Sequence, residues 1–195
     1  MKKSIVREYF ESLVIAVILA LFVRTWVFQA FKIPTGSMEP NLLVGDHLIV
    51  NKMRFAPIHR GDVMVFKFPK DPERDFVKRI MGLPGDKIEL KKKKLYINGQ
   101  LMDEPYAHFL NPPPAPDAPT SEDVRDDYGP ITVPADQYFA MGDNRDNSED
   151  SRYWGFLPKS YVKGNAEFLY FSVTDDASAG FFGGARWERI GKIVR

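Results

Sequence analysis

The sequence predicts a mostly-β protein, built as an antiparallel β-sheet or barrel-like domain that follows one N-terminal transmembrane helix. Short runs rich in β-branched and aromatic residues recur along the chain, and each is bounded by Gly, Pro, Asn or Asp. A basic start followed by a long apolar stretch precedes all of these runs. We therefore expect a cytoplasmic N-terminus and membrane anchor at residues 1–31 and a single β domain at 32–195.

The N-terminal segment carries a Lys-Lys pair and then an unbroken apolar run from Leu13 to Val23. That run is shorter than the roughly 20 residues that cross a hydrocarbon core, whereas a span of about 9–31 is long enough. The basic flank predicts a cytoplasmic N-terminus and an exported remainder. A cleavable signal peptide is a competing interpretation, but cleavage after Ala30 would place Phe28 where a small residue is required. A buried core helix is the third interpretation.

Beyond the anchor, six runs have the composition of strands, at residues 47–50, 63–66, 87–90, 95–97, 138–141 and 166–173. The pair Asn98-Gly99 between two such runs is a strong signal for a two-residue hairpin. Residues 105–127 break the pattern, because this stretch is rich in proline, which donates no backbone hydrogen bond, and lacks apolar periodicity. We interpret it as an exposed insertion in the β domain.

Composition narrows the classes of function. The formal net charge is only +1, which argues against a nucleic-acid-binding protein. The chain contains no cysteine, so disulfides and thiolate metal sites are excluded. Its three histidines are scattered and show no metal-ligand spacing. We therefore expect neither a metal nor another cofactor.

Two stretches carry side chains suited to nucleophilic chemistry. Ser37 lies in a Pro/Gly turn directly after the anchor, where Gly36 permits tight backbone geometry. Lys78 follows Phe76 at strand spacing, and if the two side chains share one face, the amine lies among apolar neighbours. Burial of this kind lowers the pKa of a lysine from about 10.4 towards neutrality. Taken alone, the stretch around Ser37 is better interpreted as an ordinary loop, and Lys78 as an exposed or salt-bridged lysine.

A third stretch, residues 141–155, is dense in Asp, Asn, Arg and Ser. A solvated loop and a calcium-binding loop are both open interpretations of that composition. The spacing of an EF-hand is not met, because the glycine at its sixth position and the flanking helices are missing.

Together, these stretches resemble type I signal peptidases. The matching motifs occur in the order of that family and cover most of the region after the anchor: Pro34–Pro40, Gly45-Asp46 with Val50–Lys52, Arg60–Val63 with Phe66, Phe76–Arg79 with Gly82–Asp86, and Gly142–Ser148 with Asp150–Arg152. The last two ranges form the most specific motif. The resemblance fades in the Pro-rich insertion and after about Phe171.

The resemblance implies a membrane-bound serine endopeptidase that removes signal peptides from exported preproteins, cutting after small residues at the first and third positions before the scissile bond. Ser37 would be the nucleophile and Lys78 its general base. The Ser37 N–H and the Thr35 hydroxyl would form the oxyanion hole, although this family often has serine at the second position. Ser148 would orient the lysine amine. Structural support would come from Asp143, Arg145, Asp150 and Arg152, and the substrate pockets would be lined by Ile33, Met38, Leu42 and Val77.

The implied partners are preprotein signal peptides and the lipid bilayer, with no nucleic acid and no metal. The implied location is the bacterial inner or plasma membrane, with the catalytic domain on the exported side. Phe181, Phe182 and Trp187 could dip into the membrane interface, although core packing explains them equally well.

Two alternatives remain open at this stage. One is a related Ser–Lys protease with a narrower substrate, of the pilin-maturation type, and the other is a membrane-tethered β-rich binding module without catalysis. The Ser160–Lys163 stretch formally matches an S-x-x-K motif, but the accompanying Lys-Thr-Gly is missing, so we treat that match as coincidental.

Overall fold

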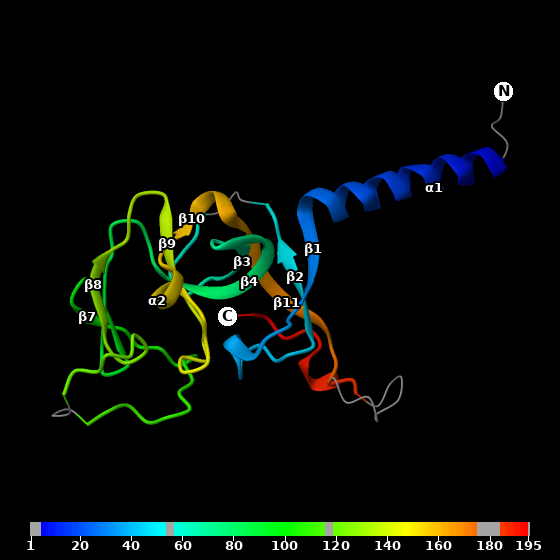
Figure 1. The fold of residues 1–195 in the computed structure, drawn as a ribbon. Coiled ribbons are helices and arrows are strands. Elements are labelled where there is room, and N and C mark those ends of the chain that lie inside the picture. The colour runs from blue at the N-terminus through cyan, green and yellow to red at the C-terminus, as the bar shows by residue number, and fades with distance from the viewer. Residues whose placement is uncertain (1–4, 54–56, 116–118, 175–183, 195) are drawn as a thin grey trace.

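The structure is a computed structural model that describes residues 5–53, 57–115, 119–174 and 184–194. Its β part consists of two antiparallel sheets (Figure 1). The larger sheet has the order β1-β2-β11-β3-β4-β9-β10, with bounds β1 Phe28–Lys32, β2 Asp46–Asn51, β3 Val63–Phe68, β4 Asp71–Gly82, β9 Gln137–Met141, β10 Leu157–Pro158 and β11 Val162–Ser172. The smaller sheet has the order β7-β6-β5-β8, with bounds β5 Lys87–Lys91, β6 Lys94–Ile97, β7 Gln100–Leu101 and β8 Tyr128–Thr132.

Among the described residues, the helical elements are short except for the first. They are α1 (Ile5–Phe22), a π-helical segment (Val23–Val27), α2 (Ser151–Trp154) and 3-10 turns at Gly36–Met38, Lys159–Tyr161 and Trp187–Arg189. The mostly-β, antiparallel fold class expected from the sequence is therefore confirmed for the described residues.

The hydrophobic core consists of three clusters. One packs Ile33, Met38 and Leu42 against the inner faces of β2, β3 and β11. The second surrounds Phe66 and Trp154, and the third lies between the two sheets around Met81 and Phe139. Strands β2, β5 and β6 bury alternate residues, whereas β4 buries five consecutive residues, Lys78 to Gly82, so Lys78 lies against apolar layers.

The N-terminal helix differs from the expected span of 9–31. Helix α1 ends at Phe22, and residues 28–32 form strand β1, which pairs with β2 through register partners such as Ala30 and Ile49. Strand pairing satisfies the backbone groups of this apolar stretch, so the helix need not continue through it. Helix α1 extends away from the β body (Figure 1). None of the helices in the described ranges combines the length and the apolar character required to span a bilayer.

All six runs expected as strands lie in strands, with small shifts at their ends. The expected hairpin at Asn98-Gly99 is confirmed: both residues have positive φ, 54° and 80°, and Ile97 pairs with Gln100. Strand β8 was not expected from the sequence because it contains Pro130. It lies at the edge of its sheet, where a residue without an N–H group is tolerated.

The Pro-rich insertion is attached to the body at its start, which differs from the expectation of an exposed stretch throughout. His108 forms a parallel bridge with Asn144, donating its N–H to Asp143 O at 2.7 Å and accepting from Arg145 N at 2.8 Å. Asp146 also accepts from Asn111 N at 2.9 Å. The insertion therefore supports the loop that follows β9.

Candidate active site

Ser37 lies in the 3-10 turn Gly36–Met38, five residues after the end of β1. Two bonds from Asn144 hold this turn: its backbone N–H donates to Ser37 O and its side chain donates to Gly36 O, both at 3.1 Å. The next side chain, Met38, is buried in the core. Ser37 is therefore fixed from both sides, with its hydroxyl directed towards β4.

Lys78 occupies the middle of β4, between β3 and β9 in the larger sheet, and is only 3% exposed. Its Nζ donates a hydrogen bond of 2.5 Å to Ser37 Oγ. The amine also lies 5.2 Å from the centre of the Phe76 ring, which confirms that these two side chains share one face. A serine hydroxyl and a buried lysine amine thus meet although 41 positions separate them in the chain.

Burial lowers the pKa of Lys78 from 10.5 to about 8, and Asp150, Glu149 and Asp143 oppose part of that shift. An amine with a pKa near 8 is about one tenth neutral at pH 7, whereas a free lysine is almost wholly charged. A neutral amine at hydrogen-bond distance from a hydroxyl can accept its proton. This geometry and this pKa meet the requirements for a general base.

Thr35 and Ser148, both predicted from the resemblance, lie beside this pair. Thr35 Oγ1 is 3.4 Å from Ser37 Oγ. Ser148 is buried next to Gly142, where an added Cβ would collide with the Ser148 side chain and the Ser37 carbonyl. Within the described ranges the Ser148 hydroxyl has no hydrogen-bond partner, so its role in orienting the amine stays a prediction.

The four residues expected as structural support belong to three buried ion pairs. Asp150 accepts from Arg152 at 2.9 and 2.8 Å and also from Gly142 N. Asp143 pairs with Arg79 through bonds of 2.8 and 2.6 Å, and Arg145 pairs with Glu104.

These ion pairs fix the charges around the amine. Burial by itself would raise the pKa of Asp150, but Arg152 and the Gly142 N–H hold it below its ordinary value. This carboxylate therefore stays negatively charged beside Lys78.

A groove of about 520 Å³ opens over Ser37 and Lys78. Three of the four residues expected to line substrate pockets, Ile33, Met38 and Val77, also line this groove, whose rim carries Glu149. Leu42 belongs to the same core cluster as Ile33 and Met38, but it lines a separate cavity of about 260 Å³ and not this groove. A larger hollow of about 630 Å³ is lined by none of the predicted site residues.

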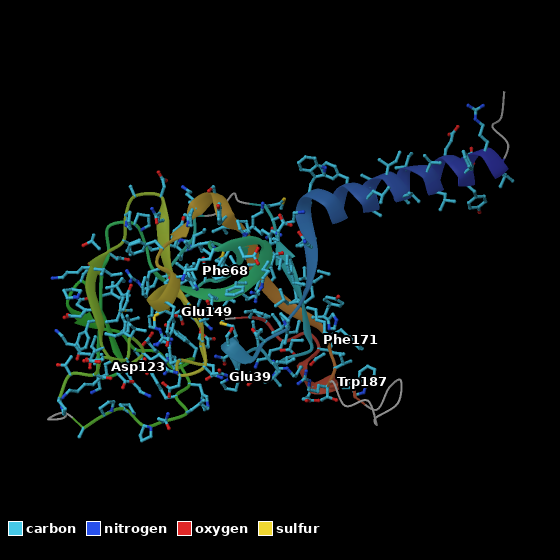
Figure 2. All side chains as sticks on the ribbon, in the orientation of Figure 1. Glu39, Phe68, Asp123, Glu149, Phe171 and Trp187 are labelled. Carbon is cyan, nitrogen blue, oxygen red and sulfur yellow. The ribbon has the colours of Figure 1, made fainter. Side chains whose placement is uncertain are left out.

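Sequence reasoning assigned no role to four residues that the structure places around the site: Asn41, Arg79, Glu104 and Asn144. Arg79 and Asn144 stand inside the quoted motifs, beside Lys78 and Asp143, so their positions gave a signal. Asn41 directly follows the quoted motif Pro34–Pro40, whereas Glu104 reaches the site from a distant segment, and neither gave a signal of its contact. Figure 2 shows Glu39 and Glu149 on the two loops that flank the site.

The structure also gives contacts for the residues of the calcium-loop and S-x-x-K interpretations and the exposure of one of the C-terminal aromatic residues. The carboxylates that suggested calcium are engaged with cations: Asp143 with Arg79, Asp146 with Lys93 and Asp150 with Arg152. Lys163 of the S-x-x-K match pairs with Asp75 at 2.6 Å, not with Ser160. Trp187 is 62% exposed and lies at the outer side of the body (Figure 2), whereas Phe181 and Phe182 lie outside the described residues.

A serine hydroxyl bonded to a buried amine of lowered pKa, at the floor of an open groove, is the arrangement of serine hydrolases that use lysine in place of histidine. Comparison with known proteins specifies the family. Residues 6–171 match the family model described as "Signal peptidase, peptidase S26". The chain belongs to this family of serine peptidases.

Similarity to individual signal peptidases supports this family assignment. The chain is 41% identical to a probable signal peptidase I-2 of Synechocystis over 87% of this chain and 78% of that protein. It is 40% identical to signal peptidase I P of Bacillus subtilis subsp. natto, over 89% of this chain and 93% of that protein. Signal peptidase I of Pseudomonas aeruginosa is 36% identical, over 98% and 81% of the two chains.

Proposed function

We propose that Ser37 and Lys78 are the catalytic pair with which this signal peptidase removes signal peptides from exported preproteins. The observation that carries the proposal is the 2.5 Å hydrogen bond between Lys78 Nζ and Ser37 Oγ, made by an amine that is 3% exposed and has a pKa of about 8. A serine and a buried lysine paired in this way beneath an open groove are suited to nucleophilic catalysis, whereas a lysine that only stabilises the fold is usually an exposed ion-pair partner.

In the proposed reaction, neutral Lys78 takes the Ser37 proton as Oγ attacks the scissile carbonyl carbon. The resulting oxyanion accepts hydrogen bonds from the Thr35 hydroxyl and the Ser37 N–H, which lies at the start of a 3-10 turn where N–H groups have no partner within the turn. The Lys78 ammonium then protonates the leaving amine. Water, deprotonated by the same amine, hydrolyses the acyl-enzyme ester and frees Ser37.

The groove supports a preference for small side chains before the scissile bond. Its apolar lining at Ile33 and Val77 comes from two chain segments that face one another across the site. An extended peptide between these segments would present alternate side chains to the lining and pair its backbone with them. Shallow apolar pockets then select residues by size.

We also propose that the N-terminal segment attaches the β domain to the bacterial inner or plasma membrane, with the N-terminus cytoplasmic and the groove on the exported side. Its support is α1, whose side chains Leu13, Ile15 and Ile18 are 62, 58 and 60% exposed, and which follows a basic flank. Because β1 joins this segment to the Ser37 turn, attachment would keep the groove near the membrane surface.

Cleavage of a purified preprotein by membranes containing the full chain tests both proposals. The wild type is expected to cut after the signal peptide and to remain in the membrane fraction after an alkaline wash. Ser37→Ala is expected to fold normally and to lose cleavage by at least about 1,000-fold, because the nucleophile is missing. Cleavage by Ser37→Ala would refute the catalytic pair, and enzyme washed into the soluble fraction would refute the anchor. A panel of exported precursors tests for the narrower pilin-type specificity, which would leave most of them uncut.

Thr35 offers a separate test of the oxyanion hole. Thr35→Val keeps the shape of the side chain and removes its hydroxyl, so we expect kcat to fall about 100-fold or more, as for loss of one oxyanion donor. Thr35→Ser keeps the hydroxyl and is expected to stay within a few-fold of the wild type. Steady-state kinetics on one preprotein measure both variants. Equal activity of the two variants would show that the Thr35 hydroxyl has no part in the reaction.

A further inference from the structure

The C-terminal segment 184–194 lies beyond the 6–171 region that matches the family, yet it is bonded to the turn that follows Ser37. Arg189 Nε donates to Asp46 Oδ1 at 2.9 Å and its Nη2 donates to Asp46 Oδ2 at 2.6 Å. The same Nη2 donates to the backbone oxygen of Asn41 at 2.9 Å. One guanidinium therefore connects both ends of the turn 41–46.

This contact is buried and has further support. Asp46 is fully buried and also accepts from the Ser172 hydroxyl and from Leu43 N. Arg186 donates to Ser172 Oγ at 2.8 Å and to Val44 O. A planar guanidinium with two bonds to a buried carboxylate has a defined geometry, so the turn is held in one position.

The turn 41–46 leads directly to the catalytic pair. Leu42 N donates to the carbonyl of Met38, the residue after Ser37, at 2.9 Å. The Asn41 side chain donates to Asp143 Oδ2 at 2.8 Å. Asp143 in turn holds Arg79, the residue after Lys78. Both members of the pair are thus adjacent in the chain to residues fixed by this turn.

We propose that Arg189 is a positioning residue, which fixes the turn 41–46 and thereby keeps the Ser37 hydroxyl within hydrogen-bond distance of the Lys78 amine. The proposal rests on the roles given above to Ser37 and Lys78. Arg189 lies outside the lining of the groove, so its effect should fall on the chemical step and not on substrate binding.

Replacement of Arg189 by methionine in the full chain tests this. We expect kcat to fall about 10-fold or more, because small displacements of reacting groups are costly, while KM stays within about 3-fold. Lys192→Met is the matched control, since it removes one positive charge from an exposed residue of the same segment, and it should keep wild-type kcat. A wild-type kcat for Arg189→Met would overturn the proposal, as would a loss confined to KM.

Loss of stability must be separated from loss of positioning, because Arg189→Met removes the nearer of the two cations of the buried Asp46 and leaves only Arg186, at 3.9 Å. The double variant Asp46→Asn/Arg189→Met removes both charges. All variants are assayed well below their melting temperatures, with folding checked by circular dichroism. A folded double variant that still has low kcat supports positioning, and one with wild-type kcat overturns it. Cleavage by the wild type but not by Ser37→Ala, measured alongside, shows whether the proposed function itself holds.

Discussion

Lys78→Met is expected to abolish cleavage and at the same time to stabilise the folded protein. Removing the general base should lower kcat about 100- to 10,000-fold. The pKa of Lys78 falls from 10.5 to about 8 because the charged amine is buried, and this shift corresponds to a destabilisation of about 3 kcal/mol at pH 7. Methionine has a similar length and carries no charge. After the lost Ser37 hydrogen bond is subtracted, we expect a gain of about 2 kcal/mol.

The stabilisation should depend on pH in a defined direction. Between pH 8 and 10.5, the folded wild type binds fewer protons at Lys78 than the unfolded chain does, since the pKa of the amine is about 8 when folded and 10.5 in the reference state. The free energy of unfolding of the wild type therefore rises with pH across that window. The advantage of Lys78→Met should be full below pH 8 and should shrink as pH rises towards 10.5.

Thermal unfolding measured from pH 7 to 10 checks this, with a gain in melting temperature of about 4–8 °C expected at pH 7. Lys67→Met is the control, because Lys67 is an exposed lysine on the neighbouring strand β3. It should change neither cleavage nor stability by more than about 0.5 kcal/mol. A Lys78→Met variant that melts below the wild type at pH 7, or that still cuts preprotein, would contradict the assignment of a buried base.

Most of the β domain could be predicted because its strands have alternating or β-branched apolar sequences and end at turn residues. Strands β1 and β8 could not be predicted, for different reasons. In the sequence, strand β1 looks like a continuation of the apolar anchor, because a short apolar run fits a helix and a strand equally well. Its pairing with β2 makes it a strand. Strand β8 contains Pro130, which is acceptable only because its position is at a sheet edge.

The site shows a similar division. Ser37 and Lys78 could be named because each lies in a specific motif, and the structure brings their side chains together. The partners of Asp143 and Arg145 could not be named, because ion pairing between distant segments leaves no spacing in the sequence. Asp143 pairs with Arg79, 64 positions away, although Arg145 is its neighbour in the chain.

Asp143→Asn is expected to destabilise the folded protein strongly, although it is a conservative change. The Arg79–Asp143 pair is 2% and 1% exposed, and the Arg79 guanidinium also lies 4.0 Å from the Tyr106 ring centre. Removing one partner of such a pair leaves a buried charge uncompensated, which costs about 3–5 kcal/mol. We expect the melting temperature to fall by about 10 °C. Cleavage should fall as well, because Arg79 adjoins Lys78 on β4.

Asp123→Asn provides a matched comparison for this prediction. Asp123 also accepts side-chain bonds from an arginine, at 2.9, 3.0 and 2.6 Å from Arg125, but that pair is 37% and 39% exposed. Water solvates either ion when its partner is lost, so the same substitution should cost less than about 1 kcal/mol there. Two pairs with similar bond lengths are thus expected to differ in the cost of their loss mainly through burial. Equal shifts in melting temperature for Asp143→Asn and Asp123→Asn would contradict the prediction, because they would show that burial does not increase the cost of losing the Arg79–Asp143 pair.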